Sequence, residues 1–132
     1  MDLALARTLA RCLAVGRVAI GATALVAPAL VAGPWIGDPA GTTEARLLAR
    51  TMGGRDLALG IGALRALSRS DAEARPWVAL GGTADAVDAL ATLVVFGTLP
   101  RRSRWGILAV TVGAAVASTR VAIALDGEGP TS

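Results

Sequence analysis

The segment 53–65 reads GGRDLALGIGALR. Its glycine, alanine, leucine and isoleucine are typical of a membrane helix, yet Arg55 and Asp56 stand next to each other within it. A charge at the centre of a bilayer costs about 2.5 kcal/mol or more on insertion scales, so charged residues in such a segment need partners. The rest of the chain must therefore supply opposite charges at the same depth.

The composition favours a helical membrane protein. Of the 132 residues, 54% are hydrophobic and only 3% are aromatic, so small residues are abundant, as suits closely packed membrane helices. The net charge is +3, and the basic residues are not interleaved with aromatic ones, which argues against nucleic-acid binding. The chain has no His and a single Cys, which excludes a Ser-His-Asp or Cys-His catalytic arrangement and zinc ligation by His and Cys. We expect no cofactor and no metal.

Four apolar segments are separated by stretches rich in Pro, Gly and charged residues. They cover residues 9–31, 47–67, 77–96 and 105–125. Each is close to the ~20 residues that cross ~30 Å of hydrocarbon as a helix. Trp35, Trp77 and Trp105 lie at segment edges, where membrane proteins place aromatic residues. We predict an all-α fold, a four-helix transmembrane bundle that forms a single integral membrane domain over 1–132. A soluble Ala-rich helical bundle is the alternative.

Four spans place both termini on one side of the membrane. That side carries five arginines and the opposite side four, which are Arg7, Arg11, Arg65, Arg69 and Arg75 against Arg46, Arg101, Arg102 and Arg104. Because cytoplasmic loops carry an excess of basic residues, the difference favours cytoplasmic termini. We predict a multi-pass protein of the inner (plasma) membrane.

Six charged residues lie within the predicted spans. They are Arg17, Arg55, Asp56, Asp85, Asp88 and Arg120, and their charges sum to zero. All except Arg55 share a helix face with small residues at i+3 or i+4 spacing, and such faces turn toward neighbouring helices. At 1.5 Å per residue, all six fall within a slab about 10 Å thick. We predict that they form one buried ionic cluster, with Arg50 near its edge.

The predicted cluster leaves three functions open. In the first, the six residues bind a small lipophilic molecule with a polar head, Arg17 and Arg120 hold an anionic or carbonyl group, and Asp85 or Asp88 is a candidate catalytic proton acceptor or donor. In the second, the chain is an accessory or scaffolding subunit of a membrane complex, and the cluster only fixes the helices. The third is a small proton-coupled transporter. Whether the protein is an enzyme is open. The expected partners are membrane lipid, the lipophilic ligand, and a second copy or another membrane protein.

Four motifs follow one another along the chain: LARCLAVGRVAIGATALVAPAL, ARLLARTMGGRDLALGIGAL, GGTADAVDAL and LPRR. This order resembles a family of small actinobacterial four-helix membrane proteins of unknown function and, more loosely, the DoxX-like membrane proteins. The resemblance covers nearly the whole chain, and its specific parts are GGRDLALG and ADAVDAL. It implies a four-helix membrane fold and no established activity, so it assigns no catalytic residue.

Overall fold

All regular secondary structure in residues 1–126, the part of the chain that this computed structural model describes, is helical. The elements are α1 (Leu3–Val26), α2 (Pro28–Ile36), a 3₁₀ helix η1 (Asp38–Gly41), α3 (Thr43–Leu67), α4 (Asp71–Val94) and α5 (Arg104–Asp126). The prediction of an all-α fold is confirmed. The predicted domain also includes 127–132, which lie outside the described residues.

Capping side chains set where three of the long helices begin. Asp2 Oδ1 accepts a hydrogen bond from the backbone N–H of Leu5 at 2.8 Å, and Thr42 Oγ1 accepts one from Ala45 at 3.2 Å. Ser70 Oγ accepts one from Glu73 at 3.1 Å. Each side chain satisfies a backbone donor that has no partner within the helix. For this reason the helices begin four to six residues before the apolar segments from which they were predicted.

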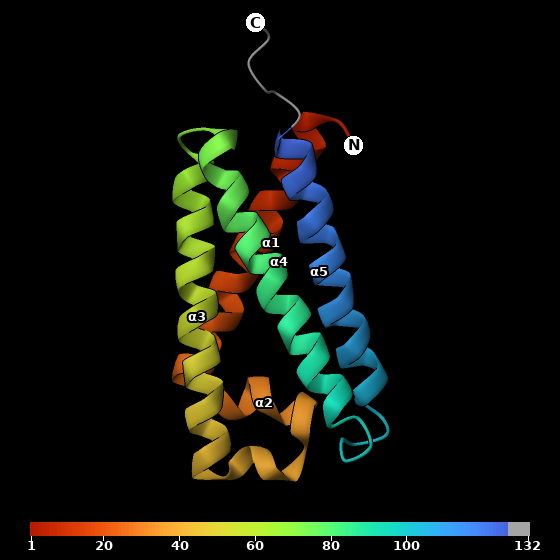
Figure 1. The fold of residues 1–132 in the computed structure, drawn as a ribbon. Coiled ribbons are helices and arrows are strands. Elements are labelled where there is room, and N and C mark those ends of the chain that lie inside the picture. Colours follow the sequence, from red (N-terminus) through yellow and green to blue (C-terminus); the bar gives the residue numbers. More distant parts are fainter. Residues whose placement is uncertain (127–132) are drawn as a thin grey trace, which may run out of the picture.

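The prediction that 9–31 forms one helix is wrong. The helix ends at Val26, Ala27 has φ −132° and ψ 66°, and α2 begins at Pro28. Proline lacks an N–H and disfavours the helical conformation in the residue before it, so the chain bends here. In Figure 1, α2 and η1 lie across the lower end of the molecule, between the end of α1 and the start of α3.

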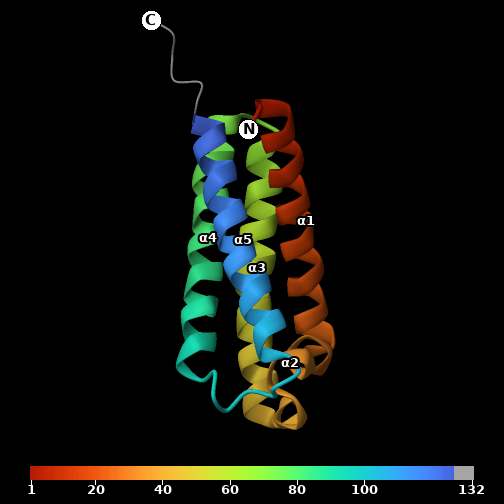
Figure 2. The same cartoon turned by 90° about the vertical axis from the view of Figure 1, so that its right-hand side faces the viewer.

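The four long helices run lengthwise beside one another as an antiparallel bundle (Figures 1 and 2). The pairs α1/α3 and α4/α5 make the most extensive contacts, and α3 with α4 and α1 with α5 join the two pairs. The N-terminus, the turn between α3 and α4, and the end of α5 all lie at one end of the bundle, which we call the terminal end. The turn between α4 and α5 lies at the other end, near α2.

Three of the described helices, α1, α4 and α5, are long and apolar enough to span a membrane. By length and composition, the structure thus supports three of the four predicted segments. Helix α3, which contains the predicted segment 47–67, is long enough but more polar. It carries six charged residues, namely Glu44, Arg46, Arg50, Arg55, Asp56 and Arg65.

Large apolar side chains lie on the outside of the bundle and small ones inside it. The main buried cluster is mostly alanine with a few larger side chains, and consists of Ala6, Ala10, Ala66, Ala74, Val78, Val121, Ala122 and Leu125. The exposed side chains include Val15, Ile20, Leu30, Leu80, Val87, Leu90, Val110, Val116 and Ile123. Alanine cores allow close helix packing, and an apolar exterior is compatible with a membrane protein.

Glycine brings the backbones of α1 and α3 into direct contact. A Cβ atom added to Gly21 would lie 2.6 Å from both the carbonyl oxygen of Gly53 and the backbone nitrogen of Leu57. A Cβ added to Gly60 would lie 2.7 Å from the carbonyl oxygen of Ala14. These distances leave no room for a side chain, so the glycines set how closely the two helices approach.

Substitution of Gly21 by alanine is expected to weaken this contact. Because the new methyl group meets backbone atoms, which cannot move aside independently, we expect Gly21→Ala to lower the free energy of unfolding by about 1–3 kcal/mol. Gly16→Ala is the matched control, because Gly16 lies in the same helix and has nothing within 4 Å of its Cβ position. Denaturant unfolding in detergent measures both. Equal stability of the two variants would contradict the close approach.

Candidate functional site

Two arginines and three aspartates form a continuous chain of ion pairs near the middle of the bundle. The order along it is Asp85, Arg17, Asp56, Arg55, Asp88, and we call it the ion-pair chain. Arg17 Nη2 lies 2.5 Å from Asp85 Oδ2, and Arg17 Nη1 lies 3.5 Å from Asp56 Oδ1. Arg55 Nη2 lies 3.0 Å from Asp56 Oδ1 and 2.8 Å from Asp88 Oδ2. Since Arg17 is in α1, Arg55 and Asp56 in α3, and the other two in α4, the chain joins three helices.

The contact between Arg55 and Asp88 has the strongest geometry. Two nitrogens of Arg55 donate to the two carboxylate oxygens of Asp88, at 3.0 and 2.8 Å. A two-point guanidinium–carboxylate contact fixes the orientation of both groups. Arg55 Nε also donates to Asp56 Oδ1 at 3.1 Å, so neighbouring residues in sequence are bonded to each other. The Arg-Asp dipeptide of GGRDLALG therefore extends the ion-pair chain from α1 to α4.

Gly81 makes room for the arginine that reaches Asp85. A Cβ at Gly81 would lie 2.8 Å from Arg17 Nε and 3.0 Å from its Cζ. Gly81 precedes Asp85 by one helical turn, so both face α1. The small-residue face that the sequence indicated on α4 thus has a definite role: the guanidinium of Arg17 lies against it.

The side chains of the ion-pair chain are largely but not completely enclosed. Asp85 falls among the buried residues, and the side-chain exposures are 11% for Arg17, 13% for Asp85 and Asp88, and 16% for Asp56. Arg55 is 32% exposed. The predicted buried cluster is therefore a partly buried one. With two positive and three negative groups, its formal charge is −1 when all are ionised, and not zero.

The prediction that Arg120 joins the cluster is wrong. Its side chain is exposed on α5 and makes no ion pair within residues 1–126. The buried face of α5 is formed by Thr111, Ser118, Val121, Ala122 and Leu125. Arg120 points away from that face. In the sequence, Gly113 and Ala117 share a helix face with Arg120, but small residues occur on more than one side of α5.

Arg50 also lies away from the ion-pair chain. Its side chain is exposed, and its Nε donates to the backbone carbonyl of Leu25 at 3.1 Å. Leu25 is in the last turn of α1, where carbonyl groups have no partner within the helix. Arg50 therefore stabilises the end of α1 just before the break at Ala27.

The cavity beside the Arg17 end of the ion-pair chain is too small for a ligand. The cavity next to Arg17 has a volume of about 10 Å³. This is about the least that one water molecule requires, whereas small-molecule sites usually measure about 300–1,000 Å³. Within residues 1–126, no group of His, Cys, Asp and Glu side chains is placed to hold a metal ion.

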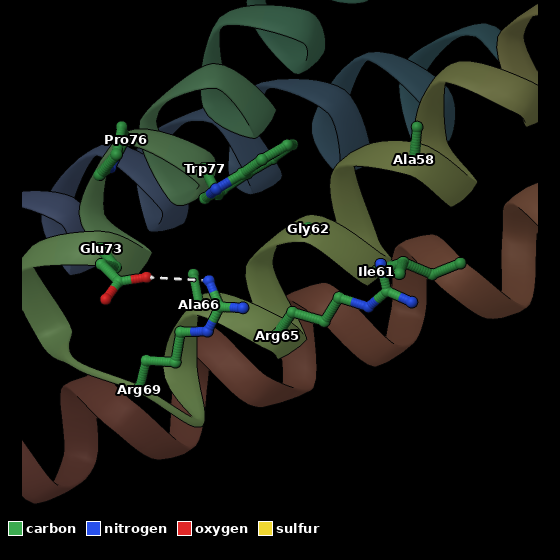
Figure 3. Close-up of a pocket in the computed structure, with 9 residues that line it drawn as sticks. All are labelled: Ala58, Ile61, Gly62, Arg65, Ala66, Arg69, Glu73, Pro76 and Trp77. Carbon is green, nitrogen blue, oxygen red and sulfur yellow. Dashed lines mark hydrogen bonds and ion pairs between the residues drawn. The ribbon is translucent and has the colours of Figure 1, made fainter.

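A larger hollow, of about 640 Å³, lies between α3 and α4 at the terminal end (Figure 3). We call it the α3–α4 groove. It is lined by Ala58, Ile61, Gly62, Arg65, Ala66, Arg69, Glu73, Pro76 and Trp77, none of which belongs to the predicted cluster. The sequence did not predict this groove. The only signals were the basic residues near the α3–α4 turn and a tryptophan at a segment edge.

Comparisons with protein families, with curated proteins and with solved structures found no match to this chain. The resemblance to small four-helix membrane proteins of actinobacteria therefore stays a prediction.

The ion-pair chain predicts unequal effects of removing its members. Arg17→Leu leaves Asp85 without its partner and changes the formal charge of the ion-pair chain from −1 to −2. We therefore expect a loss of about 3 kcal/mol in the free energy of unfolding. Asp85→Asn leaves Arg17 paired with Asp56 and the total charge at zero, so we expect about 1 kcal/mol or less. Denaturant unfolding in detergent measures both.

The double variant Arg17→Leu, Asp85→Asn should be more stable than Arg17→Leu alone, because the unpaired carboxylate is gone. Arg75→Gln is the control: it removes an ion pair with Asp126 whose side chains are 50% and 58% exposed, and such pairs contribute little. If the Arg17 variant unfolded like the parent, or if the two losses simply added, Arg17 would not be held by Asp85.

Proposed function

We propose that the chain is an integral membrane protein in which all four long helices cross the bilayer, and that it is an accessory or scaffolding subunit of a membrane complex. In this proposal the ion-pair chain fixes the relative positions of α1, α3 and α4. The observation that carries it is that every charged group of the ion-pair chain has a partner within it, and that the cavity beside Arg17 measures only about 10 Å³. Enclosed ion pairs seldom add much net stability, but they can specify one arrangement of helices.

A fourth span at α3 is supported by its packing. The helix has 25 residues, or roughly 37 Å at 1.5 Å per residue, and it runs antiparallel to α1 with backbone contacts at Gly21 and Gly60. If α1 crosses the membrane, α3 lies at the same depth. Its charges fit this position. Glu44 is in the first turn and Arg65 in the last, so both lie near an end of the helix.

The charges in the middle of α3 are the ones that need partners. Arg55 and Asp56 are paired with each other, and additionally with Asp88 and Arg17. Pairing lowers the free-energy cost of placing these groups away from water. The low hydropathy of α3 is therefore consistent with a helix that enters the membrane only as part of the bundle.

The other two functions receive less support from the geometry. Binding of a lipophilic molecule through the ion-pair chain needs a cavity there, and catalysis by Asp85 or Asp88 needs a carboxylate that a substrate can reach. Both aspartates face arginines instead. Proton-coupled transport needs water to reach these carboxylates from both sides of the membrane. Cytoplasmic termini remain part of the proposal, on the excess of arginines at the terminal end.

Reporter fusions test the number of spans and the orientation together. With four spans and cytoplasmic termini, reporters fused after Ser70 and after Ser132 are cytoplasmic, and one fused after Arg102 is external. If only α1, α4 and α5 span and the N-terminus is cytoplasmic, each reporter lies on the opposite side. Those after Ser70 and Ser132 are then external, and the one after Arg102 is cytoplasmic. A reporter pair such as a fluorescent protein and alkaline phosphatase distinguishes the two sides at each position. An external reporter after Ser70 together with a cytoplasmic N-terminus would contradict a spanning α3.

Native mass spectrometry distinguishes a structural ion-pair chain from a ligand site. We expect protein extracted gently from its membrane to carry no stoichiometric small molecule that is lost on Asp88→Asn substitution. We also expect association with a second copy or with another membrane protein. A small molecule present in the parent and absent in the Asp88 variant would contradict the structural role and assign ligand binding to the ion-pair chain.

A further inference from the structure

The α3–α4 groove is a large hollow that the ion-pair chain leaves unexplained. Helices α3 and α4 leave the turn at 68–70 together and diverge toward the other end of the bundle (Figures 1 and 2). Gly62 lies under the indole of Trp77, and a Cβ at Gly62 would come within 2.3 Å of ring atoms. The missing side chain on α3 thus lets the Trp77 ring lie flat against the helix, where it forms one wall of the groove (Figure 3).

The groove is polar at one end and apolar at the other. Arg69 and Glu73 lie next to the turn, while Ile61 and Ala58 lie farther along α3 (Figure 3). Arg65 to Ala58 spans seven residues, or roughly 10 Å along the helix. If α3 and α4 cross the membrane, the polar end is at the headgroup level and the apolar end is in the hydrocarbon. Trp77 then lies near the boundary, which tryptophan prefers.

The polar end has an excess of positive charge. It contains Arg65, Arg69 and Glu73, with a net formal charge of +1. Arg69 Nη1 lies 3.4 Å from Glu73 Oε2, but their side chains are 70% and 51% exposed, so the pair is weak. Arg65 makes no ion pair within the described part of the chain. Figure 3 shows its side chain extended along α3 toward Ile61. Two guanidinium groups thus line the groove, one weakly paired with Glu73 and one extended along α3.

We propose that the α3–α4 groove binds an anionic phospholipid. Its phosphate lies between Arg65 and Arg69, because guanidinium groups form two-point hydrogen bonds with phosphate oxygens. One acyl chain lies along Ile61, Ala58 and the face of Trp77. The groove is open to the side and measures about 640 Å³, so it holds the headgroup and the upper part of that chain, and the rest of the lipid stays in the bilayer. A zwitterionic lipid fits less well, because its headgroup carries, besides the phosphate, an ammonium group that both arginines repel.

This inference rests on the proposed membrane insertion of α3 and α4, and it differs from ligand binding at the ion-pair chain in place and in chemistry. Trp77 lines both the groove and the small cavity beside Arg17. None of the charged residues of the ion-pair chain lines the groove. Substitutions at Arg65 and Arg69 should therefore leave the ion-pair chain intact.

Quenching of Trp77 fluorescence by brominated lipid tests the proposal. The full chain with Trp35→Phe and Trp105→Phe keeps Trp77 as its only tryptophan. It is reconstituted in mixtures of phosphatidylglycerol and phosphatidylcholine in which one lipid at a time carries brominated acyl chains. Quenching gives the association constant of each lipid at the groove relative to the other. We expect phosphatidylglycerol to be preferred, and the preference to fall about tenfold in Arg65→Gln, Arg69→Gln.

The matched control is Arg101→Gln, Arg102→Gln, which removes the same charge from exposed arginines at the opposite end of the bundle. We expect the control to retain the preference of the parent. Equal quenching by the two lipids in the parent, or an equal fall in both double variants, would overturn the lipid site while leaving the four-span proposal standing. The reporter fusions decide that proposal separately, so the two failures are distinguishable.

Discussion

Charged side chains enclosed between apolar helices must pair with one another, and the arrangement of this bundle follows from that requirement. Arg17 and Arg55 each contact two carboxylates, and the resulting line of contacts runs from α1 through α3 to α4. Ion pairs need distances near 3 Å, so the three backbones have to lie close together. Glycine at positions 21, 60 and 81 provides the space, twice for a neighbouring backbone and once for the guanidinium of Arg17.

The same requirement separates two regions of the protein. In the middle, carboxylates and guanidinium groups bind one another in a continuous line of ion pairs. At the terminal end, the groove between α3 and α4 is lined by Arg65 and Arg69, which stand beside open space. Charged groups that are paired with one another fit a structural role. Arginines beside an apolar groove fit the binding of an anionic lipid. The two proposals thus assign different roles to arginines that the sequence alone does not distinguish.

Much of the ion-pair chain was predictable because its members occupy helix faces that the sequence displays. Arg17, Asp56, Asp85 and Asp88 each align with small residues, and Arg55 is adjacent to Asp56. Arg120 was misplaced because α5 is rich in small residues around much of its circumference, so spacing did not identify the packed face. The break at Ala27 was visible in the sequence as the residue before Pro28, but the apolar run through it indicated one helix. The α3–α4 groove depends on Gly62 and Trp77, which lie on different helices, and no local pattern relates them.

Opposite charges on α3 and α4 hold these helices together, and exchanging the charges of Arg55 and Asp88 tests this pairing. Thermal unfolding in detergent would be compared for Arg55→Asp, Asp88→Arg and the variant carrying both. Arg55→Asp places four carboxylates around Arg17 and should unfold at a much lower temperature than the parent. The exchanged variant restores the opposite pair and the total charge of −1, so it should recover most of the loss. The pairing of Arg55 with Asp88 would be contradicted if Arg55→Asp alone unfolded at the same temperature as the parent. It would also be contradicted if the exchanged variant were no more stable than Arg55→Asp.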